Sequence, residues 1–132
     1  MRSPEPSPDF SGLWIPLVTP FIAGADAAVD HPALARLVAR LRGTGIAGFV
    51  ACGSTGEAAA LDADEQQAVL DTVLQAAQGL PVVMGLSGYH LPKMLASVQA
   101  FSRQPVAALL VAAPSYIRPA QAGLLRWFTD LA

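Results

Sequence analysis

The segment GIAGFVACGSTGE, residues 45–57, gives the clearest indication of the fold class. Its first part, residues 45–51, is a run of small and apolar side chains typical of a buried strand. Its second part, residues 53–57, combines two glycines with adjacent hydroxyl residues and is a turn signal. A helical pattern follows. The stretch therefore predicts a strand that leads through a glycine-rich turn into a helix.

The turn itself predicts a binding function. It places the hydroxyls of Ser54 and Thr55, and the N–H groups of a glycine-rich segment, at the end of a strand. Such a nest of donors suits a small carboxylate. In the alternative interpretation, both hydroxyls bond only to the local backbone. A phosphate-binding loop is not indicated, because the Gly-Lys-Ser/Thr ending of that motif is missing.

The same order of apolar strand, loop and amphipathic helix recurs along the chain. We expect strands at residues 12–17, 46–52, 81–86 and 106–112 and helices after Asp30, after Asp62, over 91–102 and from Pro119 onward. The βαβαβαβα order predicts an α/β fold with a parallel sheet. Two architectures fit it: four units of a (β/α)₈ barrel, or a small doubly wound sheet. A complete barrel needs about 200 residues or more, and this chain has 132.

Local signals mark the helix starts and the buried faces. Asp30 with Pro32 predicts one helix start, and Asp62 with Glu65 predicts a capping box at the next. The strand over 106–112 is apolar throughout, as in strands covered on both faces. For the last helix we expect one apolar stripe, made of Leu124, Leu125, Phe128 and Leu131.

The composition narrows the function classes. The net charge is −2 and no basic cluster exists, so nucleic acid is not expected as a partner. The chain is 53% hydrophobic and only 14% charged, and this apolar surplus predicts packing against more chain or another subunit. A single cysteine, Cys52, favours a reducing compartment, and His31 and His90 form no metal pattern. The longest apolar run, residues 106–113, is too short to span a membrane. We expect residues 1–11 to be a disordered leader and the protein to be cytoplasmic.

Three motifs carry a resemblance to a known family. The segments GLWIPLVTPF at residues 12–21, GIAGFVACGSTGE at 45–57 and PSYIRP at 114–119 resemble the dihydrodipicolinate synthase / N-acetylneuraminate lyase family. These proteins are pyruvate-dependent class I aldolases on a (β/α)₈ barrel. The resemblance runs from about Leu13 to Ala132 and covers the N-terminal half of the family's pattern. It implies that residues 12–132 form the first four βα units of a TIM barrel.

The resemblance also implies roles for single residues. Thr55 is similar to the residue whose hydroxyl and N–H hold the pyruvate carboxylate, with Gly53 beside it. Ser54 is similar to the first hydroxyl of a proton relay, and Tyr116 to the relay tyrosine that is lent across a dimer interface. Thr19 is similar to a threonine at the floor of the pocket. No metal or organic cofactor is implied, since the Schiff base serves as the electron sink. Pyruvate, an aldehyde and a second copy of the chain are the implied partners.

The resemblance leaves three family residues without a counterpart in this chain. These are the Schiff-base lysine on a later strand, the second relay tyrosine, and the arginine that synthases use for their second substrate. The lone lysine, Lys93, is expected on the outer first turn of the third helix. We therefore expect these 132 residues to be a truncated reading frame or a fragment, inactive alone and prone to pair through the open edges of its first and fourth strands.

The sequence leaves the substrate class open. The pair Arg118-Pro119 favours the synthase branch of the family over the sialate lyases. A 2-keto-3-deoxy sugar acid aldolase and a non-catalytic half-barrel that binds carboxylates also fit the three motifs.

Overall fold

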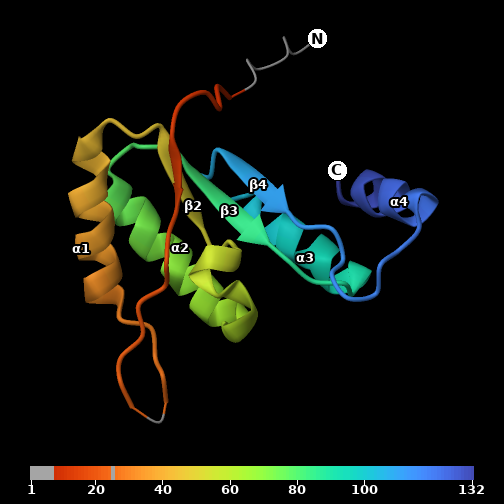
Figure 1. Ribbon diagram of the computed structural model, residues 1–132, viewed down its shortest axis with the longest axis horizontal. Helices are drawn as coiled ribbons and strands as arrows, with labels where there is room; N and C mark the ends of the chain where they lie inside the picture. The colour runs from red at the N-terminus through yellow and green to blue at the C-terminus, as the bar shows by residue number, and fades with distance from the viewer. Residues whose placement is uncertain (1–7, 25) are drawn as a thin grey trace.

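The computed structural model describes residues 8–24 and 26–132, in which strands and helices alternate (Figure 1). The four strands are β1 (Trp14–Pro16), β2 (Gly48–Ala51), β3 (Val82–Leu86) and β4 (Ala108–Val111). The four α-helices are α1 (His31–Leu41), α2 (Ala63–Ala77), α3 (Leu91–Phe101) and α4 (Gln121–Leu131), and three short 3₁₀ turns are η1 (Arg42–Thr44), η2 (Ser54–Gly56) and η3 (Ala58–Ala60). The predicted alternation is confirmed.

The strands form one parallel sheet in the order β1-β2-β3-β4. Its register places Ile15 opposite Phe49, and Gly85 opposite Leu110. Each strand neighbours the next one along the chain, and right-handed crossovers then put the connecting helices on the same face. A doubly wound sheet reverses its strand order and carries helices on both faces. The fold is therefore of the barrel type, with four βα units.

The two faces of the sheet differ in burial. On the helix side, Phe49 and Met84 are fully buried and join helix residues such as Leu34, Val38 and Leu70 in the core. By strand register, the opposite face carries only apolar residues and glycines: Trp14, Pro16, Gly48, Val50, Val83, Gly85, Ala108 and Leu110. The expectation that β4 is covered on both faces is wrong for this chain. Leu110 is 54% exposed, because β4 is an edge strand and no described element covers its face on the side away from the helices.

The helix starts follow their sequence signals. The Asp30 carboxylate accepts the N–H of Ala33 at 2.9 Å at the start of α1. Asp62 and Glu65 form the predicted capping box of α2, with both hydrogen bonds at 2.9 Å. These caps satisfy amides that the first turn of a helix leaves unpaired.

The last helix differs from the prediction. It begins at Gln121 rather than at Pro119 and buries Trp127 and Leu131, whereas Leu125 and Phe128 are 72% and 42% exposed. Figure 1 shows α4 beside α3, away from α1 and α2. The helix carries more than one apolar stripe. The stripe that contains the large Trp127 ring is the one buried by packing on α3.

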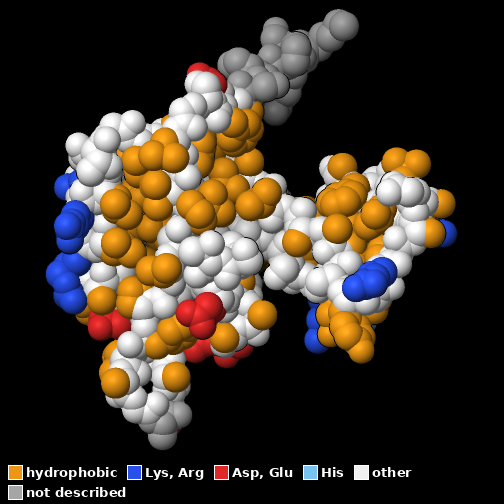
Figure 2. All heavy atoms as spheres, in the orientation of Figure 1, with side chains coloured by type: hydrophobic (Ala, Val, Ile, Leu, Met, Phe, Trp, Pro, Cys, Tyr) orange, Lys and Arg blue, Asp and Glu red, His pale blue; other side chains and the backbone are white. Residues whose placement is uncertain are grey.

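Residues 1–7 of the expected leader lie outside the described residues. Within the described part of this segment, Phe10 contacts the start of the sheet. The Phe10 and Trp14 rings lie 5.5 Å apart, and the Trp14 indole N–H donates to the Phe10 carbonyl at 3.1 Å. Hydrophobic side chains gather on the face around β1 and on α4 (Figure 2). Among the helices of the described residues, none combines the length and the apolar character that a membrane crossing requires.

Candidate active site

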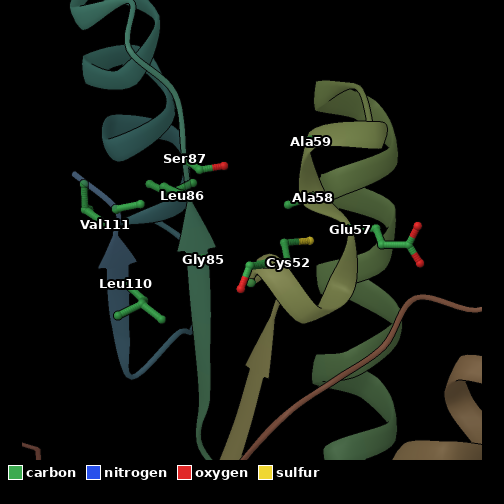
Figure 3. Close-up of a pocket in the computed structure, with 12 residues that line it drawn as sticks. Cys52, Glu57, Ala58, Ala59, Gly85, Leu86, Ser87, Leu110 and Val111 are labelled. Carbon is green, nitrogen blue, oxygen red and sulfur yellow. The ribbon is translucent and has the colours of Figure 1, made fainter. Parts of the chain in front are cut away.

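A pocket of about 460 Å³ opens at the carboxyl ends of β2, β3 and β4. In Figure 3 the segment that follows β2, which contains Cys52, Ala58 and Ala59, faces Leu110 and Val111 of β4 across the end of β3. Active sites of barrel enzymes lie at this end of the strands. The pocket is lined by Cys52, Gly53, Ser54, Glu57, Ala58, Ala59, Gly85, Leu86, Ser87, Leu110, Val111 and Ala112.

The turn after β2 presents free hydrogen-bond donors. It is closed by the N–H of Gly56 on the Gly53 carbonyl at 3.0 Å and by the N–H of Glu57 on the Ser54 carbonyl at 3.1 Å. Within residues 8–24 and 26–132, the amides of Ser54 and Thr55 donate to no backbone carbonyl. Ser54 and Thr55 are both exposed, and Gly53 before them is half-buried. Two N–H groups and two hydroxyls can therefore serve a small anion.

The backbone at both ends of this turn is left-handed. Cys52 has φ of 53° and Glu57 has φ of 54°, values that non-glycine residues adopt at a cost. Contacts on both sides hold the turn in this shape. The Thr19 hydroxyl donates to the Gly56 carbonyl at 2.7 Å. On the other side Gly85 lies so close that an added Cβ would overlap the carbonyl oxygen of Cys52.

The structure brings only some of the predicted site residues together. Gly53 and Ser54 line the pocket, and Thr55 is exposed on the same turn. Thr19 lies beneath the turn, only 5% exposed, with its hydroxyl on Gly56. Tyr116 is 94% exposed on the loop after β4, with φ of 63°, and is not among the pocket residues.

The sequence patterns indicate no binding role for Cys52, Gly85 or Ser87, which also line the pocket. A signal exists for Gly85, because a glycine inside an apolar strand often marks a close approach of another backbone. Ser87 follows β3 directly. Its place at the same edge as Ser54 follows from the parallel order of the strands.

Burial raises the pKa of the Cys52 thiol from 9.0 to about 11. The thiolate is the reactive form, so at pH 8 about one molecule in a thousand is reactive when folded, against about one in ten when unfolded. We expect iodoacetamide to label the folded chain at pH 8 about 100-fold more slowly than the chain in urea, with the rate rising about tenfold per pH unit. Equal labelling rates would contradict the burial of this thiol.

The lone lysine lies elsewhere. Lys93 is exposed on the first turn of α3, as predicted, and its N–H donates to Nδ1 of His90 at 3.2 Å. It lines a second hollow of about 380 Å³ beside the start of α3, not the pocket with the turn. In the part of the chain that the structure describes, no three His, Cys, Asp or Glu side chains gather as for a metal ion.

Comparison with known proteins decides the family. Residues 9–132 match the sequence profile of the Dihydrodipicolinate synthetase family. The chain belongs to this family. A 4-hydroxy-tetrahydrodipicolinate synthase from Magnetococcus marinus is 38% identical over 125 residues, which cover 93% of this chain and 41% of that protein. The synthase of the same name from Ruegeria pomeroyi is 39% identical over 92% of this chain and 41% of its own length.

Solved structures agree with this placement in the dihydrodipicolinate synthetase family. The dihydrodipicolinate synthase of Aquifex aeolicus superposes with a TM-score of 0.85 at 28% identity, over 92% of this chain and 41% of that one. A prophage protein of the same family from E. coli K12, solved in complex with pyruvate, has a TM-score of 0.82 at 26% identity, over 94% of this chain and 42% of that one. The chain thus spans about two fifths of the length of the relatives that it matches.

Proposed function

We propose that the protein to which these residues belong is a pyruvate-dependent lyase that works as a 4-hydroxy-tetrahydrodipicolinate synthase, joining pyruvate to an aldehyde through a Schiff base. The observation that carries the proposal is the turn over residues 53–57, which leaves amides and hydroxyls free at the carboxyl edge of barrel strands. The relatives' names support the choice of reaction, and the prophage protein solved with pyruvate supports the choice of ligand.

The site residues divide the work as follows in this proposal. The hydroxyl and N–H of Thr55, with the backbone at Gly53, bind the pyruvate carboxylate, and Thr19 underlies this site. A lysine amine from outside these residues attacks C2 of pyruvate, and water leaves as the Schiff base forms. Loss of a proton from C3 gives an enamine, whose C3 forms the new bond to the aldehyde carbon. Ser54, and Tyr116 from a second copy, pass the protons that these steps release and require.

The binding step can be tested on the 132 residues alone. We expect saturable pyruvate binding in titration calorimetry. Thr55→Ala should weaken it about tenfold, because it removes one hydrogen bond to a charged group. Thr129→Ala, which removes an exposed hydroxyl on α4, is the matched control and should leave the affinity unchanged. An unchanged affinity in Thr55→Ala would contradict the assignment.

Covalent capture is not expected on these residues, since Lys93 lies outside the pocket with the turn. After treatment with pyruvate and borohydride, the mass of the chain should stay at 13.7 kDa. A reduced pyruvate adduct on Lys93 would overturn the proposed division of roles. The position of Lys93 also favours the second candidate function for these residues taken alone, a carboxylate-binding module without catalysis.

The proposal extends to assembly and location. A homo-oligomer is supported by the exposed apolar side chains of Tyr116 and Ile117 and by the two edge strands, β1 and β4. A cytoplasmic location is supported by the single, buried cysteine.

A further inference from the structure

Thr19 is the one buried polar side chain among residues 8–24 and 26–132, and it is 5% exposed. It follows β1, whereas the turn follows β2. Its hydroxyl donates to the carbonyl of Gly56, 37 residues further along the chain, at 2.7 Å. The space around Gly56 is closed on the same side, because an added Cβ would lie 2.9 Å from the Leu17 carbonyl oxygen. The turn is thus seated on the segment that follows β1.

The hydrogen bond from Thr19 to Gly56 is connected to the Thr55 amide through two planar peptide groups. The Gly56 carbonyl shares a rigid plane with the N–H of Glu57. That N–H donates to the Ser54 carbonyl at 3.1 Å, and the Ser54 carbonyl shares its own plane with the N–H of Thr55. Fixing the Gly56 carbonyl therefore fixes the direction of the Thr55 N–H. Successive hydrogen bonds of this kind polarise one another in the same sense.

We infer that Thr19 is a positioning residue, which aims the Thr55 amide at the substrate carboxylate from beneath the turn. The inference rests on the proposed function and replaces direct contact between Thr19 and substrate by an indirect role. The hydroxyl proton of Thr19 is already committed to Gly56, so it is not free to bind a ligand. The two left-handed residues that flank the turn, Cys52 and Glu57, explain why such a clamp is needed.

The test compares three variants of the 132-residue chain. Thr19→Val keeps the shape and removes the donor, whereas Thr19→Ser keeps the donor. Val73→Ala, in the second half of α2 and fully buried in the wild type, lowers stability without touching the turn. Two quantities are measured under conditions in which each variant is folded: the amide hydrogen exchange rate of Glu57, and the dissociation constant for pyruvate.

We expect Thr19→Val to raise the Glu57 exchange rate about tenfold and the pyruvate dissociation constant about fivefold, which is the loss of about one hydrogen bond. Thr19→Ser should stay within about twofold of the wild type in both. Val73→Ala should leave the pyruvate dissociation constant unchanged. It should raise the Glu57 exchange rate by no more than its loss of global stability explains. If Thr19→Val does not fold, Thr19→Cys, whose thiol is a weak donor, takes its place in the same comparison.

Two results would overturn the inference. One is a Thr19→Val chain with wild-type exchange at Glu57 and wild-type affinity. The other is a Val73→Ala chain that shows the same two changes, which would mean that Thr19 contributes stability only. If the wild type binds no pyruvate, the proposed function fails, and the Glu57 exchange rate still decides whether Thr19 holds the turn.

Discussion

Replacing Gly85 by alanine is expected to lower the free energy of unfolding by about 3 kcal/mol and to abolish pyruvate binding. A Cβ at this position would overlap the Cys52 carbonyl oxygen and lie 2.8 Å from the Cys52 carbonyl carbon and 2.9 Å from the Gly53 nitrogen. All three are backbone atoms, so no side chain can swing aside. The turn would have to move away from β3, and its amides would move with it.

Gly43→Ala is the matched control, because an added Cβ there meets nothing within 4 Å. Its effect on stability should stay within about 0.5 kcal/mol. Urea unfolding at equilibrium and a pyruvate titration measure both consequences. A Gly85→Ala chain with wild-type stability and affinity would show that β3 and the turn are not in close contact.

Replacing Phe49 by alanine is expected to destabilise the chain by about 3–5 kcal/mol. Phe49 is fully buried in the middle of the sheet, on the face that the helices cover. Its loss removes a large apolar surface and leaves a cavity that rigid strands on both sides cannot close. The shift of the urea midpoint at unchanged slope measures the effect.

Leu125→Ala provides the comparison for Phe49, since Leu125 is 72% exposed on α4. We expect its cost to stay below about 0.5 kcal/mol. A similar loss of stability in both variants would mean that α4 buries its second apolar stripe in solution. A small loss for Phe49→Ala would contradict the position of the core.

Much of the fold could be predicted from the sequence because its signals are local. The capping box of Asp62 and Glu65 involves neighbours in the chain, and both of its hydrogen bonds form. The alternation of strands and helices follows from apolar periodicity in the same way. The end of the barrel at which Ser54 lies follows in turn from the parallel order of the strands.

The errors arise where tertiary contacts choose between local options. The last helix carries two apolar stripes, and packing beside α3 selects the one with Trp127. Leu110 belongs to a strand whose sequence is typical of burial on both faces, yet one of its faces has no covering element in the described residues. Periodicity shows that a face is apolar, but it does not show what covers that face.

The candidate site was predictable in part for the same reason. A glycine-rich turn with two hydroxyls can be recognised in the sequence, whereas the bond from Thr19 to Gly56 joins residues 37 positions apart. The overlap that excludes a side chain at Gly85 likewise depends on how two strand ends meet. Tyr116 is 94% exposed and has a left-handed backbone with φ of 63°, a conformation that a tyrosine in the sequence does not indicate.

The proposed function depends on binding of the pyruvate carboxylate by the turn over residues 53–57. The most direct measurement follows the backbone amide resonances of the ¹⁵N-labelled chain during a pyruvate titration, with acetone as the control that keeps the ketone and lacks the carboxylate. We expect pyruvate, and not acetone, to shift the Ser54 and Thr55 amides saturably. Shifts confined to the second hollow around His90 and Lys93, or no shift at the turn at saturating pyruvate, would contradict carboxylate binding at the turn.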